Sequence, residues 1–115
     1  MVKIGRKAPE FEVQAFVDGQ IGSIKLSDYL GKWTVLFFYP GDFTFVWVTE
    51  LAAVAVRYDE FRELGAEVIA MSLDSPFVHK VWNEQELEEM VEGGAPFAMA
   101  TDPAGAVGTA YHVFD

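Results

Sequence analysis

The sequence contains no cysteine among its 115 residues. Disulfides, thiolate metal sites and any thiol chemistry carried by the chain's own side chains are therefore excluded. Histidine is almost as scarce: His79 and His112 lie far apart and do not have the spacing typical of a metal site. We expect no metal, and we expect no cofactor because the chain has no phosphate-binding glycine loop.

Positive charge and long apolar runs are also scarce. Eight Lys and Arg face 18 Asp and Glu, which gives a formal net charge of −10. Such a surface repels nucleic acid and anionic membranes, so neither is expected as a partner. The N-terminal MVKIGRKAPEF has no apolar signal-peptide core, and the apolar run around 35–38 is far too short to span a membrane. A cytoplasmic location is the expectation.

What the chain does have is apolar side chains, which make up 51% of it and include ten Phe. We therefore expect one domain, residues 1–115, with a real core. The elements expected, in chain order, are a hairpin of 11–17 and 21–26, a strand at 33–39 buried on both faces, a helix at 49–64, a strand at 67–73, a helix at 77–83, a strand at 97–100 and a short helix at 104–111. Alternating strands and helices predict an α/β fold with a mostly parallel sheet behind the hairpin.

The first place to look for chemistry in such a sheet is the segment beyond the carboxyl end of the first long apolar strand. It contains Pro40 and Thr44 and reaches position 47 as the next helix begins. A thiol in the first turn of a helix is acidified by the unpaired N–H groups there. A threonine hydroxyl nearby can bond to a substrate oxygen, and a proline can keep water away.

The stretch FFYPGDFTFVWVTE resembles the active-site stretch of the peroxiredoxins. Their pattern is Pro, three residues, Thr or Ser, two residues and Cys, usually followed by Pro-Thr-Glu; Pro40, Thr44, Thr49 and Glu50 match it. KAPEF near the start and SLDSPFVHKVW further on resemble two more stretches of the family. The resemblance covers about residues 3–115, is greatest for the typical two-cysteine branch, and implies a thioredoxin-like fold.

The resemblance also implies an activity and a set of site residues. Family members reduce hydrogen peroxide and alkyl hydroperoxides through a peroxidatic cysteine, here at position 47, with a thiol reductant such as a thioredoxin-like protein. Pro40, Thr44, position 47 and Glu50 would form that ancestral site, and Glu50 would orient an arginine. Taken alone, Glu50 is expected to be a carboxylate in the first turn of a helix, stabilised by the helix dipole.

The departures from the pattern are as informative as the matches. Trp47 stands where the family has its peroxidatic Cys, and Val48 replaces the usual Pro. Family members continue past the equivalent of Asp115 with two more strands and a helix, which carry the active-site Arg and the resolving Cys. An indole offers only an N–H donor, so we expect this chain to be a C-terminally truncated and catalytically inactive form.

Alternatives are open for both the residue and the molecule. Trp47 is a core or interface aromatic or, alternatively, a ligand-stacking platform, and it is either a natural loss or an engineered substitution. The molecule is alternatively a non-catalytic module for self-assembly, chaperone-like or engineered. Self-association would use the edge Trp33–Tyr39, left open by the missing strand, and the loops 43–48 and 77–82. An ordinary thioredoxin-like redox protein is excluded because it would need a cysteine.

Overall fold

The structure, a computed structural model, describes residues 2–114 apart from the side chains at positions 45 and 46. Its elements, in chain order, are β1 (Glu12–Val17), β2 (Gln20–Lys25), the 3-10 turn η1 (Leu26–Tyr29), β3 (Trp33–Phe38), α1 (Phe45–Val56), α2 (Tyr58–Glu63), β4 (Ala66–Ser72), α3 (Pro76–Trp82), the π-helical turn η2 (Asn83–Leu87), α4 (Glu88–Met90), β5 (Ala98–Thr101), η3 (Pro103–Gly105) and α5 (Ala106–Ala110).

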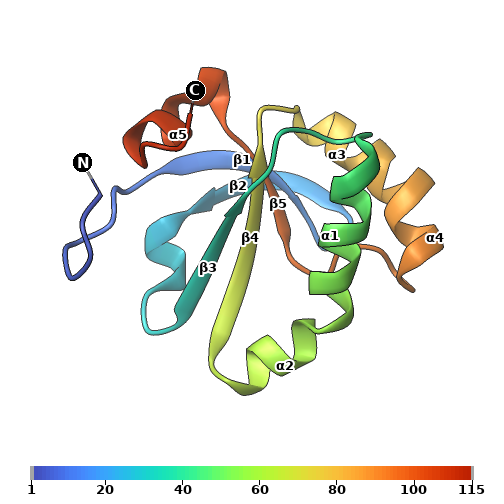
Figure 1. Cartoon of the computed structure of the whole chain (residues 1–115), viewed down its shortest axis with the longest axis horizontal. Coiled ribbons are helices and arrows are strands. Elements are labelled where there is room, and N and C mark those ends of the chain that lie inside the picture. The colour runs from blue at the N-terminus through green and yellow to red at the C-terminus, as the bar shows by residue number, and fades with distance from the viewer. Residues whose placement is uncertain (1, 115) are drawn as a thin grey trace.

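One five-stranded sheet, in the order β2-β1-β5-β4-β3, forms the centre of the molecule (Figure 1). β3, β4 and β5 run parallel, as expected for strands joined by helical crossovers. β1 and β2 form the predicted antiparallel hairpin, and β1 also pairs antiparallel with β5. The α/β architecture with a mostly parallel sheet behind an N-terminal hairpin is therefore confirmed.

Side chains of the central strands alternate between two hydrophobic clusters, one on each face of the sheet. Val68 and Ala70 of β4 join Leu51 of α1 and Trp82 of α3 in the cluster on one face. Ile69 and Met71, on the other face, join a cluster that includes Val107 of α5. Helices α1 to α4 cover the first face and α5 covers the second, so the sheet lies between two helical layers (Figure 1).

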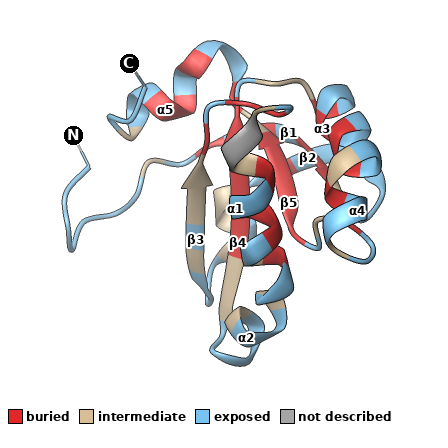
Figure 2. Cartoon of the chain, turned by 45° about the vertical axis from the view of Figure 1, so that its right-hand side comes forward, coloured by how far each residue is buried: buried red, intermediate tan, exposed pale blue. Residues whose placement is uncertain are grey.

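The strand β3 is an edge of this sheet, as the resemblance predicted for a chain without the following strand. The expectation that its residues are buried on both faces was wrong. Trp33 is 80% exposed and Val35 is 38% exposed. No residue of β3 falls in the buried class, and the strand carries no buried colour in Figure 2. Apolar composition alone does not distinguish an edge strand from a central one, because strand order depends on pairing with distant segments.

The helix after β3 begins earlier than predicted, at Phe45 instead of position 49, and it ends at Val56. A second helix, α2, follows Arg57 as a separate element. The early start corrects the expectation for Glu50, because that residue is the sixth of α1 and no acidic residue lies in the first turn. Its exposed carboxylate therefore gains little from the helix dipole, which acts within the first turn.

Within residues 2–114, the structure has no helix that is long and apolar enough to cross a lipid bilayer.

Candidate functional site

The loop between β3 and α1 lies at the carboxyl end of the parallel strands, where sites in such sheets form. Pro40 is exposed directly after the strand, and Thr44 is the N-cap residue of α1. The Thr44 hydroxyl does not accept a hydrogen bond from the helix amides; it donates to the carbonyl of Gly41 at 2.9 Å. Phe43, between them, has a positive φ of 58°. A non-glycine residue in that conformation is strained, and such strain is concentrated at functional sites.

Position 47 is the third residue of α1 and lies in its first turn, where the positive end of the helix dipole acts. Trp47 is half-buried at the margin of the core. Its ring meets Phe37 edge-on, with 5.6 Å between centroids, and lies tilted against Tyr39 at 6.3 Å. The indole therefore packs back onto β3 and the start of the loop.

The four residues singled out in the sequence do not gather around one point. Thr44 and Trp47 lie together at the start of α1, and Glu50 follows on the second turn as an exposed carboxylate. Pro40 lines a cavity to which Trp47 contributes no side chain. The structure thus brings the loop and the helix start together and leaves Glu50 exposed on the second turn of α1.

A buried polar network ties this loop to the rest of the fold through its residue Asp42. The hydroxyl of Tyr39 donates to Asp42 Oδ1 at 2.6 Å, and His79 Nδ1 is 2.7 Å from Asp42 Oδ2. The side chains of Asp42 and His79 are both fully buried. His79 Nε2 lies 3.0 Å from the carbonyl oxygen of Ala100, which can only accept, so Nε2 carries a proton. Nδ1 and the Asp42 carboxyl thus share the remaining proton.

A second carboxylate fixes the backbone of the loop. Asp74 Oδ2 accepts a hydrogen bond from the Asp42 amide at 2.6 Å and from the Ser72 hydroxyl at 2.9 Å. Ser75, not Asp74, caps α3, because its Oγ accepts from the amide of Val78 at 3.2 Å. Residues from the end of β4 therefore hold the loop that follows β3.

Tyr39 connects the network to the aromatic core. Burial, followed by the neighbouring Asp42 carboxyl, raises the pKa of Tyr39 far above its ordinary value, so its phenol stays protonated. Its ring stacks on the fully buried Trp82, with 5.9 Å between centroids. Trp47 packs against the same tyrosine. The position expected to carry the reactive group is thus supported by a rigid, hydrogen-bonded aromatic.

Sequence analysis missed most of this network. It considered His79 only as a possible metal ligand and gave it no polar partner, whereas the structure pairs it with Asp42. The signal available was an acidic residue in the turn PGDF, directly after an apolar strand. Asp102, to which Sequence analysis gave no role, is also buried. Its two carboxylate oxygens accept from the amides of Val107 at 2.7 Å and Gly108 at 2.8 Å, which caps α5.

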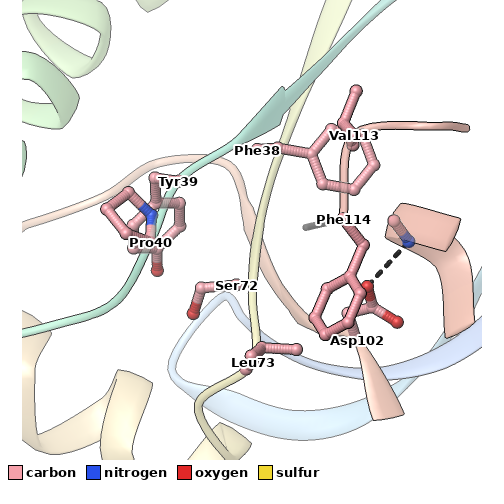
Figure 3. A pocket seen from close by; sticks show the side chains of 9 residues that line it. Phe38, Tyr39, Pro40, Ser72, Leu73, Asp102, Val113 and Phe114 are labelled. Carbon is pink, nitrogen blue, oxygen red and sulfur yellow. Dashed lines mark hydrogen bonds between the residues drawn. The ribbon is translucent and has the colours of Figure 1, made fainter. Parts of the chain in front are cut away.

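A cavity of about 310 Å³ opens at the carboxyl ends of the strands (Figure 3). Its polar lining includes Ser72 and Asp102. The carboxylate oxygens of Asp102 already accept hydrogen bonds from amides of α5. Phe38 and Phe114 provide much of its apolar wall. The cavity is therefore a mostly apolar hollow beside the loop, with Pro40 at its rim and position 47 outside it.

Comparison with known proteins first defines the class. The chain superimposes on Enterococcus faecalis AhpC with a TM-score of 0.87 and 38% identity, covering 96% of this chain and 64% of that one. It also superimposes on a Plasmodium yoelii protein, Prx1a modified at the N-terminus, which forms an artifactual octamer; the TM-score is 0.88 at 32% identity, with 98% and 66% covered. The fold is thus the thioredoxin-like fold of the peroxiredoxins.

The family follows from the sequence comparisons. The AhpC/TSA family model matches residues 4–115. The selenocysteine-containing peroxiredoxin PrxU of Peptoclostridium acidaminophilum is 58% identical over 115 residues, which is all of this chain and 57% of that protein. The chain therefore belongs to the AhpC/TSA family, as the resemblance predicted, and it spans little more than half the length of this relative.

Proposed function

We propose that this chain holds the peroxide-reducing site of its family and that, with Trp47 in place, the site is catalytically silent. The observation that carries the proposal is the location of position 47. It lies in the first turn of α1, behind the strained Phe43 and above the buried Asp42–His79 pair. In this proposal the site architecture is retained while the reacting atom is missing.

The reaction needs an anionic nucleophile at position 47. A thiolate there attacks one oxygen of the peroxide, the O–O bond breaks, and the products are a sulfenic acid and, after protonation, water or an alcohol. The first-turn amides of α1 favour the thiolate. An indole N–H supplies no such electron pair, so the unmodified chain does not carry out this step. A thiol reductant, thioredoxin-like in the proposal, would restore the thiol.

The nucleophile is not restricted to sulfur. The Peptoclostridium relative is a selenocysteine-containing peroxiredoxin, and its similarity extends over every residue of this chain. A selenol is a more acidic and more nucleophilic counterpart of a thiol. The same position in this chain would therefore suit either a cysteine or a selenocysteine side chain.

The substitution Trp47→Cys tests the proposal. Because the chain has no cysteine, the variant carries a single thiol whose oxidation by peroxide can be followed without background. We expect it to form a sulfenic acid, trapped by dimedone and weighed by mass spectrometry, about tenfold faster than free cysteine, as one unit of pKa depression would give. With dithiothreitol as reductant, peroxide consumption should become catalytic.

The matched control is Ala53→Cys, which places one exposed thiol on the same helix but away from its N-terminus. Its oxidation rate should be that of free cysteine. Peroxide turnover by the unmodified chain would contradict the proposal that the site is inactive with Trp47 in place. A folded Trp47→Cys variant that reacts no faster than the Ala53→Cys control would overturn the site itself.

Self-assembly is a second candidate function, which one observation favours. The edge strand β3 exposes Trp33 at 80%, and Phe43 and Phe77 are exposed at 49% and 68% in the two segments expected to form contacts. Exposed backbone at a sheet edge is a template for pairing with another chain, and large aromatics anchor interfaces. The proposed mode is pairing of β3 with β3 of a second copy, and its test belongs with that strand below.

A further inference from the structure

Three tryptophans occur in this chain, and only Trp47 stands at the position where the family carries its nucleophile. Trp82 is fully buried and stacks on Tyr39 within the core. Trp33 is an exposed residue at the start of the edge strand. Trp47 lies in the first turn of α1, where the family's nucleophile is expected. The first two are explained by packing or position in the sheet, and the third replaces a reacting group.

The surroundings of Trp47 are more elaborate than a packing position needs. The loop before it contains the strained Phe43, and the fully buried Asp42–His79 pair holds that loop to α3. Burying such groups is costly unless they are paired and hydrogen-bonded, as Asp42 and His79 are. The segment before position 47 is thus built to hold the start of α1 in one place.

The genetic code offers a direct way for a reactive residue to appear as tryptophan. Selenocysteine is inserted at UGA codons, and several genetic codes read UGA as tryptophan. The ordinary tryptophan codon, UGG, differs from it by one base. If a UGA codon for selenocysteine is translated with a genetic code that reads UGA as tryptophan, tryptophan results at that one position. The rest of the sequence is unchanged.

We propose that position 47 is encoded by UGA and that the residue present in the native protein is selenocysteine, so that Trp47 is the alternative translation of that codon. The inference rests on the proposed function of this site. Its independent support is the selenocysteine-containing relative, 58% identical over all 115 residues, together with the absence of any cysteine that could take the nucleophile's part.

The proposed chemistry balances with a thiol as co-reactant. The selenolate attacks a peroxide oxygen; a Se–O bond forms, the O–O bond breaks, and the leaving oxygen takes a proton. The selenium is oxidised to a selenenic acid and the peroxide is reduced. One thiol then displaces water to give a selenenyl sulfide, and a second thiol releases the selenol with formation of a disulfide. Both thiols come from outside these 115 residues, which contain none.

The first experiment determines codon 47 in the gene and the residue in the native protein, isolated from its source grown with selenite. We expect UGA, and we expect the peptide that spans position 47 to show the isotope pattern of selenium. The peptides that span Trp33 and Trp82 are internal controls and should contain tryptophan. A UGG codon, a tryptophan in the position 47 peptide, or a product that ends at Val46 would each overturn the inference.

Alkylation gives a readout that does not depend on turnover. At mildly acidic pH the native protein should react with iodoacetamide at position 47, whereas the Trp47→Cys variant should be protonated and slow. Equal reaction of the two would count against a selenol. The two proposals fail separately: a UGG codon leaves a peroxide-reactive Trp47→Cys variant unaffected, and selenium without peroxide reactivity would overturn only the proposed function.

Discussion

The geometry of the loop at the site depends on two residues that lie 37 positions apart. Asp42 and His79 meet at 2.7 Å with both side chains fully buried, and Tyr39 completes the bonding of the carboxyl. His79 in turn bonds to the backbone of β5 through Ala100. The loop after β3 is thus tied to α3 and β5 through one imidazole, which sets the start of α1 and with it the placement of position 47.

Removing the Asp42 carboxyl should therefore destabilise the whole fold. In Asp42→Ala the imidazole and the Tyr39 hydroxyl lose a buried partner, and we expect a loss of about 3–5 kcal/mol in the free energy of unfolding. Asp42→Asn keeps an acceptor for Tyr39 and offers an N–H to a neutral His79, so its loss should be clearly smaller. Urea unfolding followed by circular dichroism measures both.

An exposed aspartate provides the control for this pair. Asp59 lies on the solvent side of α2, and Asp59→Ala should change stability by no more than about 0.5 kcal/mol. If Asp42→Ala were as stable as the Asp59 variant, the buried pair would not hold the loop. If Asn were no better than Ala, the shared proton between Asp42 and His79 would be the wrong description.

Individual site residues were predicted only where a local pattern identifies them. Pro40, Thr44 and position 47 follow from the spacing of one short stretch, and that stretch does lie at the carboxyl end of β3 and the start of α1. Asp42 was overlooked because its partner is distant in the sequence. Asp102 received no role because the amides that it binds belong to the short helix that follows it.

At the scale of elements, β3 is one of the two edge strands of the sheet, and β2, which ends in Lys25, is the other. β3 carries Trp33 at 80% exposure and no charged side chain from Trp33 to Phe38. Natural edge strands usually carry a charge, a proline or a bulge that discourages pairing. β3 therefore favours association with a second copy of the chain.

A charge on this edge should weaken self-association. We expect Trp33→Lys to raise the dissociation constant of the assembly about 30-fold, as the loss of an aromatic anchor worth about 2 kcal/mol would do. Sedimentation velocity over a range of concentrations measures the change. Val56→Lys, on an apolar side chain of α1 that is 69% exposed, is the matched control and should leave association unchanged. A chain that stays monomeric at high concentration, or equal effects of the two substitutions, would contradict pairing through β3.

Most elements were predictable because their periodicity is local. The hairpin and the strand β4 both follow from short-range signals. The start of α1 was placed four residues too late, since FTFVWVTE is apolar almost throughout and shows no helical stripe. The burial of β3 was also misjudged, because an apolar strand has the same composition at an edge as at the centre of a sheet.

At the scale of the whole molecule, every tyrosine of this acidic chain is held in its neutral form. Burial is the first cause of the raised pKa of all four, Tyr29, Tyr39, Tyr58 and Tyr111, and a nearby carboxylate contributes in each case. A net charge of −10 makes such neighbours common. The tyrosines of the folded state therefore keep their phenol protons at a pH near 10.0, the ordinary tyrosine pKa, where the unfolded chain releases them.

This difference predicts a loss of stability in alkaline solution, with Tyr39 as its main source because it is the most deeply buried. Below pH 10 both states hold the proton and the contribution is fully present; above it only the unfolded chain ionises, so stability falls as pH rises. Tyr39 adds about 1.4 kcal/mol per pH unit to the slope once its phenol is ionised in the unfolded chain. Tyr39→Phe should lower the baseline stability but reduce the slope above pH 10 by that amount. Urea unfolding across this range measures both quantities, and the phenolate absorbance of Tyr39, taken as the difference from Tyr39→Phe, should appear only with unfolding. An unchanged slope in Tyr39→Phe, or ionisation of Tyr39 in the folded chain near its ordinary pKa, would show that the phenol is not held by the Asp42 network.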